Sequence, residues 1–218
     1  MTKGADTTDR RGRFITFEGG EGAGKSTQIA RAASFLKDRQ IDPVVTREPG
    51  GSPGAEQIRR LLVEGEPGRW DAVTEMLLHF AARRDHVRTV IAPALAEGRW
   101  VLCDRFVDST LAYQGYGHGL GEAPVRQLAD LTIDSVWPDL TIVLDLPVEQ
   151  GLKRAGERAG REHRYERMGL DFHRRLREGF LAIAAADPDR CRVINAMRPV
   201  DEIADEIAIS LEQFLITY

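Results

Sequence analysis

The sequence predicts an α/β fold in which five parallel strands form one sheet and helices cover both faces. Five short apolar segments rich in Val, Ile and Leu alternate with long helical patterns, as in parallel sheets buried on both sides. A glycine-rich turn follows the first segment, and charged residues stand at the ends of the next three. Ligands of such folds bind at the carboxyl ends of the strands. The expected strands span residues 13–18, 43–47, 100–104, 140–146 and 192–195.

Length, charge and cysteine content limit the classes of protein to consider. The chain has 218 residues, the size of one α/β domain. Its net charge of −4 argues against a general nucleic-acid surface, and no apolar run approaches the roughly 20 residues that span a membrane. Cys103 and Cys191 stand in apolar runs, which predicts buried free thiols in a reducing compartment. We expect a flexible tail over residues 1–12, one domain over residues 13–218, and a cytoplasmic protein with no nucleic-acid or membrane partner.

The turn over residues 19–26 matches the phosphate-binding pattern G-x-x-x-x-G-K-[ST], the P-loop. It lies between a strand pattern and a helical pattern over residues 27–39, the context that this loop requires. Its backbone N–H groups and the helix start attract phosphate oxygens, Lys25 reaches the β- and γ-phosphates, and the Ser26 hydroxyl is a Mg²⁺ ligand. The predicted ATP site comprises Gly19, Gly20, Glu21, Gly22, Ala23, Gly24, Lys25, Ser26 and Thr27.

Charged residues end the second and third strands. Arg47 and Glu48 precede a Pro-Gly loop that leads into a helix over residues 55–64, and a solvated ion pair is the alternative to a ligand site there. Asp104 ends the third strand beside the P-loop, where a carboxylate is placed to hold Mg²⁺ or its waters. Arg105 supplies a fork that suits a phosphate.

The longest helical pattern covers residues 70–97 and carries an apolar stripe at helical spacing. A proline inside it predicts a kink or break near residues 89–93. His79 and Arg83 stand four residues apart, so they share one face beside the stripe; a partly buried core histidine is the alternative for His79. Arg84 falls within the stripe, so its guanidinium must be paired or face a polar cavity.

Two more segments are rich in polar side chains. Residues 108–117 contain hydroxyls, an amide and tyrosines that can recognise a base and a sugar, with a polar helix and a glycine-rich turn as the alternative. Residues from about 150 to 167 are rich in arginine, and such a charge run is usually a solvated face. Here a lid could deliver arginines to a transferring phosphoryl group. Among these arginines are Arg154, Arg158, Arg161 and Arg164.

With these residues assembled, the chain closely resembles the thymidylate kinase family. The resemblance covers about residues 13–215 in matching order and spacing. It implies a P-loop NTPase fold with a nucleoside monophosphate kinase-like domain, transfer of the ATP γ-phosphate to dTMP for dTTP biosynthesis, Mg²⁺ as cofactor, and a homodimer. The matching pieces are residues 17–27, Thr46-Arg47-Glu48-Pro49-Gly50-Gly51, Asp104-Arg105-Phe106, and Ser109-Thr110-Leu111-Ala112-Tyr113-Gln114-Gly115.

The resemblance also implies roles for single residues. The thymine contacts fall on Arg83, Thr110 and Gln114, the sugar contact on Tyr113, and the dTMP phosphate on Arg105. Glu21 in the P-loop together with an arginine-rich lid resembles the bacterial subtype, in which lid arginines assist catalysis. The catalytic set is Lys25, Arg105, Arg158 and Arg161, the metal set is Ser26 and Asp104, and the dTMP set is Arg47, Glu48, Arg59, His79, Arg83, Arg105, Thr110, Tyr113 and Gln114.

One departure from the family pattern leaves a choice of register. The family places Phe or Tyr four residues before the thymine arginine, and here that residue is His79. Spacing along the chain favours His79 with Arg83, whereas the apolar stripe favours Phe80 with Arg84. Two other functions stay open from the residues: a kinase for another nucleoside monophosphate, and a P-loop ATPase that acts as a switch. The sequence lacks the Asn-Lys-x-Asp guanine-reading motif.

Overall fold

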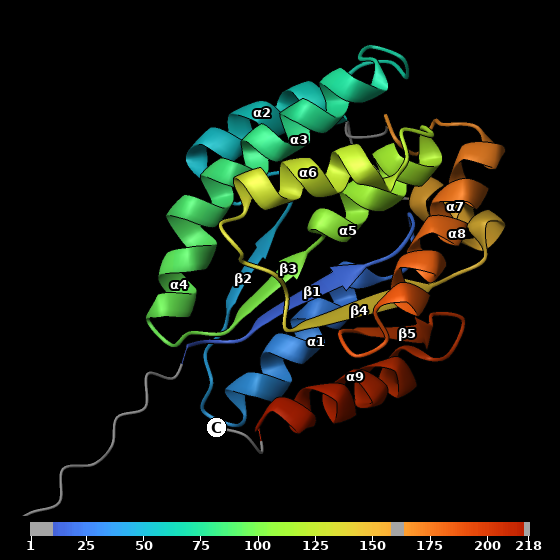
Figure 1. The fold of residues 1–218 in the computed structure, drawn as a ribbon. Helices are drawn as coiled ribbons and strands as arrows, with labels where there is room; N and C mark the ends of the chain where they lie inside the picture. Colours follow the sequence, from blue (N-terminus) through green and yellow to red (C-terminus); the bar gives the residue numbers. More distant parts are fainter. Residues whose placement is uncertain (1–10, 158–163, 216–218) are drawn as a thin grey trace, which may run out of the picture.

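A computed structural model describes residues 11–157 and 164–215 of the chain. Its core is a sheet of five parallel strands in the order β2-β3-β1-β4-β5 (Figure 1). The strands are β1 (Phe14–Glu18), β2 (Val44–Arg47), β3 (Val101–Asp104), β4 (Leu140–Asp145) and β5 (Cys191–Asn195). The predicted α/β class and the five expected strands are therefore confirmed, with ends that differ by one residue at most.

Helices connect the strands and pack on both faces of the sheet. Before β3 the chain forms α1 (Lys25–Lys37), α2 (Pro53–Val63), α3 (Ala72–His86), the π-helical η1 (Val87–Ile91) and α4 (Ala92–Ala96). After β3 it forms α5 (Val107–Thr110), the π-helical η2 (Leu111–Gly117), α6 (Glu122–Thr132), α7 (Val148–Gly156), α8 (Leu170–Ala186) and α9 (Val200–Leu215).

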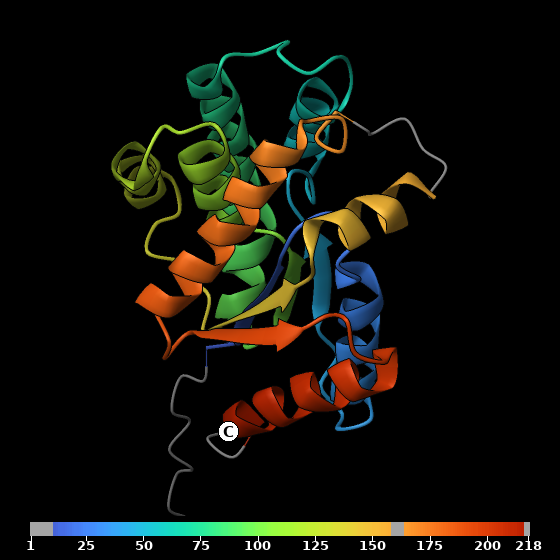
Figure 2. The same cartoon turned by 90° about the vertical axis from the view of Figure 1, so that its right-hand side faces the viewer.

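Alternate residues of the central strand β1 enter two separate cores. Ile15 and Phe17 pack with α1 and α9, whereas Phe14 points to the core formed by α3, α4, η2 and α8. Figure 2 shows these two layers on opposite sides of the sheet. Because both faces of the sheet are covered by helices, the polar ends of its strands are where a ligand can reach it.

The helical pattern over residues 70–97 forms three consecutive segments. The regular helix α3 ends at His86, η1 makes one π-helical turn, and α4 contains Pro93. A proline has no N–H to bond the carbonyl four residues earlier and crowds it, so the helix widens just before it. The predicted break near residues 89–93 is confirmed and begins slightly earlier.

Other expectations from the sequence meet the structure with small changes. Cys103 and Cys191 are both buried and free, as predicted. The N–H of Gly12 donates to the carbonyl of Leu95 at 2.9 Å, so the folded part includes the last residue assigned to the tail. Residues 1–10 lie outside the described part. Among described residues, no helix has the length and apolarity needed to cross a bilayer.

Candidate active site

A cleft of about 340 Å³ opens at the carboxyl ends of the strands. It is lined by the P-loop, the loop after β2, one face of α3, the end of β3 and η2. The predicted residues that line it are Glu21, Gly22, Ala23, Gly24, Lys25, Ser26, Arg47, Glu48, Arg59, His79, Arg83, Asp104, Arg105, Thr110, Tyr113 and Gln114. Gly19 and Gly20 lie beside a smaller neighbouring cavity. Thr27 lines neither, and Arg158 and Arg161 lie outside the described residues.

Lys25 begins α1 and folds back over the P-loop. Its ammonium donates to the carbonyls of Gly19 and Gly20, at 3.2 Å each. The side chain is 8% exposed, and burial together with the nearby charge of Arg105 lowers its pKa. Among the described residues this buried ammonium bonds two carbonyl oxygens and no carboxylate, so it is well placed to accept a phosphate as its counter-charge.

The P-loop lies against the start of α7 without room for a side chain. Gly22 has a φ of +68°, and a Cβ there would come within 2.1 Å of the carbonyl oxygen of Gly151. A Cβ on Gly151 would in turn come within 2.4 Å of the carbonyl oxygen of Glu21. Only glycine fits at either position, so backbone contacts set the spacing between the phosphate loop and α7.

Ser26 and Asp104 meet where β1 and β3 end side by side. The Ser26 hydroxyl donates to Asp104 Oδ2 at 3.4 Å, and the register pairs Phe17 with Asp104. Asp104 Oδ1 is buried and has no hydrogen-bond partner among the described residues. A hydroxyl and a carboxylate with a spare oxygen suit Mg²⁺, which takes few protein ligands and completes its shell with water and phosphate oxygens.

Arg105 lies between the phosphate loop and η2. Its guanidinium donates to the Gly19 carbonyl at 3.0 Å and to Glu21 Oε1 at 3.1 Å, and it lies 5.0 Å from the centre of the Tyr113 ring. Tyr113 donates its hydroxyl hydrogen to the same Glu21 oxygen. Burial raises the pKa of Glu21, but the charges of Arg105 and Lys25 outweigh it and bring that pKa to about 2. Glu21 therefore links the P-loop to the opposite wall of the cleft as an anion.

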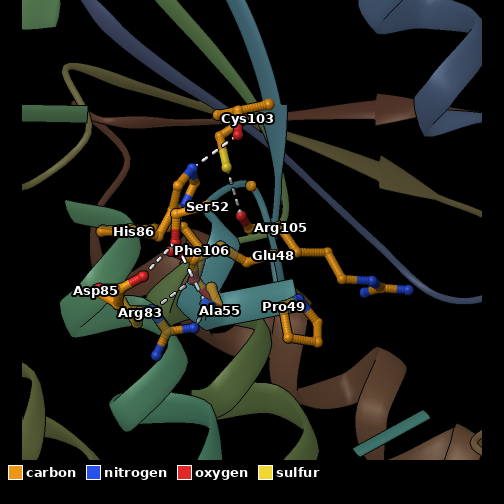
Figure 3. A network of polar contacts seen from close by, with 12 residues as sticks. Glu48, Pro49, Ser52, Ala55, Arg83, Asp85, His86, Cys103, Arg105 and Phe106 are labelled. Atoms are coloured by element: carbon orange, nitrogen blue, oxygen red, sulfur yellow. Dashed lines mark hydrogen bonds and ion pairs between the residues drawn. The ribbon is translucent and has the colours of Figure 1, made fainter. Parts of the chain in front are cut away.

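Glu48 holds Arg83 and His86 in place (Figure 3). Its Oε2 accepts from Arg83 Nε at 2.7 Å, and its Oε1 lies 3.0 Å from His86 Nδ1. Burial raises the pKa of Glu48, but the charge of Arg83 and the hydrogen bond of His86 outweigh it, so the pKa is lowered. Because both oxygens are engaged, Glu48 acts on the cleft through Arg83. The alternative Arg47–Glu48 pair does not form, since Arg47 pairs with Glu56 at 3.3 Å.

The structure places His79 and Arg83 on the cleft and Phe80 in the core. Arg83 is 2% exposed and donates through Nη2 to the Phe106 carbonyl at 2.9 Å and to Thr110 Oγ1 at 3.1 Å. Its Nη1 is buried without a partner in the described part of the chain. Arg84 instead pairs with Asp134 outside the cleft. The apolar stripe favoured Phe80 with Arg84, but Phe80 packs inward, with its ring centre 4.8 Å from the guanidinium carbon of Arg83.

His79 contacts Tyr165, which lies in the segment between α7 and α8. Its Nε2 lies 2.8 Å from the Tyr165 hydroxyl, whose ring packs edge-on against Tyr113 at 5.2 Å. Burial lowers the pKa of His79 to about 4. The imidazole is therefore neutral at pH 7, so an uncharged ring could lie beside it without facing a charge on His79.

This shift in pKa predicts a pH dependence of stability. The pKa of His79 falls from 6.5 in the unfolded chain to about 4 in the fold, so its contribution is complete above pH 6.5 and is lost as the pH falls toward 4. The lost contribution is on the order of 2 kcal/mol. We expect urea unfolding of the native chain to lose more stability between pH 7 and pH 4.5 than unfolding of His79→Gln. Equal losses in the two proteins would contradict the assignment.

Several residues of the site were missed in the sequence. Glu18 is fully buried beneath the cleft and accepts from the Phe106 N–H at 2.7 Å and the Ser109 hydroxyl at 2.5 Å. Burial and the charge of Asp108 raise its pKa to about 7. A charged residue in an otherwise apolar strand, directly before the P-loop, was the available signal. Conversely, Asp145, the charged residue at the end of β4, does not line this cleft and pairs with Arg177 at 2.7 Å.

Glu75 and Tyr165 were also missed. Glu75 is fully buried four residues before His79, on the same face of α3, which was a usable signal. Tyr165 lines the cleft from the segment between α7 and α8. No periodicity marks that segment, so its approach to Tyr113 and His79 was not readable from the sequence.

The arrangement can hold two anions next to each other. Lys25 and the P-loop form one positive end, and Arg105 lies between that end and the pocket formed by Arg83, Thr110, Tyr113 and Gln114. A partly buried chamber with a few polar side chains, lying beyond a phosphate site, suits a nucleotide base. The geometry therefore fits phosphoryl transfer between two phosphorylated compounds.

Comparison with known proteins gives one consistent result. The family model described as thymidylate kinase matches residues 17–207. A thymidylate kinase of Dinoroseobacter shibae is 56% identical over 200 residues, covering 92% of this chain and 96% of the relative. One from Caulobacter vibrioides is 56% identical over 201 residues, covering 91% and 95%. The crystal structure of thymidylate kinase from Ehrlichia chaffeensis superposes with a TM-score of 0.74 at 36% identity, covering 92% of this chain and 99% of that one.

Proposed function

The chain belongs to the thymidylate kinase family, and from that premise we propose that its cleft transfers the γ-phosphoryl group of ATP to dTMP, giving dTDP and ADP. The enzyme is a dTMP kinase, a transferase of nucleotide biosynthesis that leads to dTTP. The roles of single residues below belong to the proposal and rest on the contacts already described.

One observation carries the choice of base. Two buried polar atoms at the cleft have no partner in the described part of the chain: Arg83 Nη1, a donor, and Gln114 Oε1, an acceptor. Thymine presents the complementary pair, because O4 accepts a hydrogen bond and N3–H donates one. Cytosine presents the reverse pair, an amino donor and a ring acceptor. The wrong base would leave these buried groups without hydrogen-bond partners, and the free-energy cost of that makes it bind much more weakly.

The protein contributes position and charge rather than covalent chemistry. Lys25 and the N–H groups of the P-loop bind the ATP phosphates, and Arg105 directs the dTMP phosphate toward them. The attacking phosphate oxygen of dTMP is already ionised at neutral pH, so no strong base is needed. Tyr113 and Tyr165 close the sugar end of the pocket with their rings packed edge-on. Arg47 and Arg59 add positive charge at the cleft.

The proposal includes Mg²⁺, held through Ser26 and Asp104. The unpartnered Asp104 Oδ1 and the adjacent hydroxyl give the oxygen ligands that this ion prefers. When bound, Mg²⁺ neutralises charge on the ATP phosphates. No group of three or more acidic, histidine or cysteine side chains suited to a metal occurs within residues 11–157 and 164–215, which agrees with an ion that arrives on the nucleotide. The lid arginines Arg158 and Arg161 keep their proposed role at the transferring phosphate.

A homodimer in the cytoplasm completes the proposal. Val73 and Leu77 lie four residues apart on α3 and are 47% and 51% exposed. Neighbouring exposed apolar side chains on one helix face are typical of an interface. Light scattering on the purified protein should give twice the chain mass, and a mass of one chain would contradict the dimer.

The function is tested by assaying a panel of nucleoside monophosphates with ATP and Mg²⁺. Coupled detection of ADP should give the highest kcat/KM with dTMP, a lower value with dUMP, and the lowest with dCMP, dAMP and dGMP. EDTA should abolish turnover. Equal ATP turnover with and without a monophosphate would contradict the kinase and favour a switch.

A further inference from the structure

Gln114 can face the cleft in only one way. Its side-chain nitrogen donates to Glu75 Oε1 at 2.7 Å, and both side chains are fully buried. A carboxylate accepts hydrogen bonds and cannot donate them, so the amide nitrogen must point at Glu75. The amide oxygen is then the atom left for the cleft, where it has no partner among the described residues. Glu75 therefore decides whether Gln114 offers an acceptor or a donor.

The surroundings of Glu75 keep it ionised. Arg164 donates to its second oxygen, and His118 Nε2 lies 3.3 Å from its first. Burial raises the pKa of Glu75, but the nearby His118 imidazole and the ion pair with Arg164 outweigh it and lower that pKa to about 2. Arg164 also donates to the Leu62 carbonyl at 2.8 Å, which fixes it at the end of α2.

We propose that Glu75 is a positioning residue for base selection, which holds the Gln114 amide with its oxygen toward the base. This inference rests on the proposed function, because it needs a pyrimidine beside Gln114. With Glu75 in place, Gln114 presents an acceptor oxygen to the base. Thymine and uracil match it, because their N3–H donates a hydrogen bond. Cytosine does not, because its N3 is also an acceptor and the two atoms repel each other. The choice between a 2,4-dioxopyrimidine and an aminopyrimidine therefore depends on a residue that does not line the cleft.

Glu75→Gln removes this control while keeping the side-chain shape. An amide at position 75 can offer either oxygen or nitrogen, so Gln114 can rotate and present its nitrogen to cytosine N3. We expect the ratio of kcat/KM for dTMP to that for dCMP to fall by about tenfold, the size of one hydrogen bond made or lost. The ratio of dTMP to dUMP should stay unchanged, because the two bases share the edge that Gln114 contacts.

Matched variants separate selection from simple damage. Arg164→Lys disturbs the same buried ion pair but leaves a carboxylate facing Gln114, so its dTMP to dCMP ratio should match that of the native chain. If Glu75→Gln fails to fold in a thermal melt, Glu75→Asp serves instead, because its shorter side chain withdraws the carboxylate from Gln114 and keeps the charge for Arg164.

The outcomes distinguish this inference from the proposed function. A native enzyme that does not prefer dTMP would contradict the proposed function itself. A native enzyme with the preference, together with a folded Glu75→Gln protein of unchanged dTMP to dCMP ratio, would overturn the role of Glu75 alone. An equal fall of the dTMP to dCMP ratio in Arg164→Lys would also overturn the role of Glu75, because the effect would then come from loss of the ion pair.

Discussion

Replacement of Lys25 by alanine is expected to lower kcat by about 10³-fold while the protein stays folded. The ammonium is buried at the P-loop and bonds the main-chain carbonyls of Gly19 and Gly20. No other lysine lines the cleft among the described residues, so none replaces this charge at the ATP phosphates. Because charge grows on the transferred group in the transition state, the loss should appear mainly in kcat rather than in KM.

A matched control lies at the other end of the same helix. Lys37 ends α1 and is 60% exposed beside Asp42. Lys37→Ala should keep native kcat and KM, which shows that shortening a lysine in α1 is harmless by itself. Thermal melts of both variants check the fold. Turnover by Lys25→Ala within a few-fold of native would contradict the assignment of the P-loop.

Replacement of Arg105 by alanine should raise KM for dTMP by about 10²-fold and lower kcat as well. Arg105 donates to Gly19 on the ATP side and to Ser109 at 3.2 Å on the acceptor side. Its loss also leaves the partly buried Glu21 beside Tyr113 without its main counter-charge. A neighbouring anion repels an incoming phosphate, so the variant should do worse than loss of one hydrogen bond.

Kinetics with varied dTMP and saturating ATP measure this effect. Arg105→Lys keeps the charge but loses the two-pronged geometry of the guanidinium. Its KM for dTMP should therefore lie between the values for the native chain and for Arg105→Ala. Arg126→Ala removes an exposed arginine that pairs with Glu122 on α6, and should leave both constants unchanged. An unchanged KM for dTMP in Arg105→Ala would remove this residue from the acceptor site.

The sheet and the phosphate loop could be predicted because their signals are local. Apolar runs and the spacing of glycines around Lys25 need no knowledge of distant residues. The residues after β2 and β3 were found because parallel strands bring their carboxyl ends to one edge. Arg83 was preferred to Arg84 because its spacing from the motifs on both sides matches the family pattern, and the structure places Arg83 on the cleft.

The remaining parts of the site depend on contacts between distant residues. Glu48 bonds Arg83 at a separation of 35 residues, and Arg164 bonds Glu75 at a separation of 89. A sequence does not distinguish a buried arginine or glutamate from one on the surface. The partner of a buried charge is therefore known only from the folded structure. The sequence therefore predicted which residues line the cleft better than which residues hold them there.

The contact between Gly22 and Gly151 limits how this protein can vary. A methyl group at position 22 would collide with the backbone carbonyl of Gly151, and one at position 151 would collide with the backbone carbonyl of Glu21. By contrast, a Cβ on Gly20 would meet nothing within 4 Å. In a library that randomises both segments, functional clones should tolerate many residues at position 20 and retain glycine at 22 and 151. The distance between the phosphate loop and α7 thus depends on the absence of a side chain at both positions.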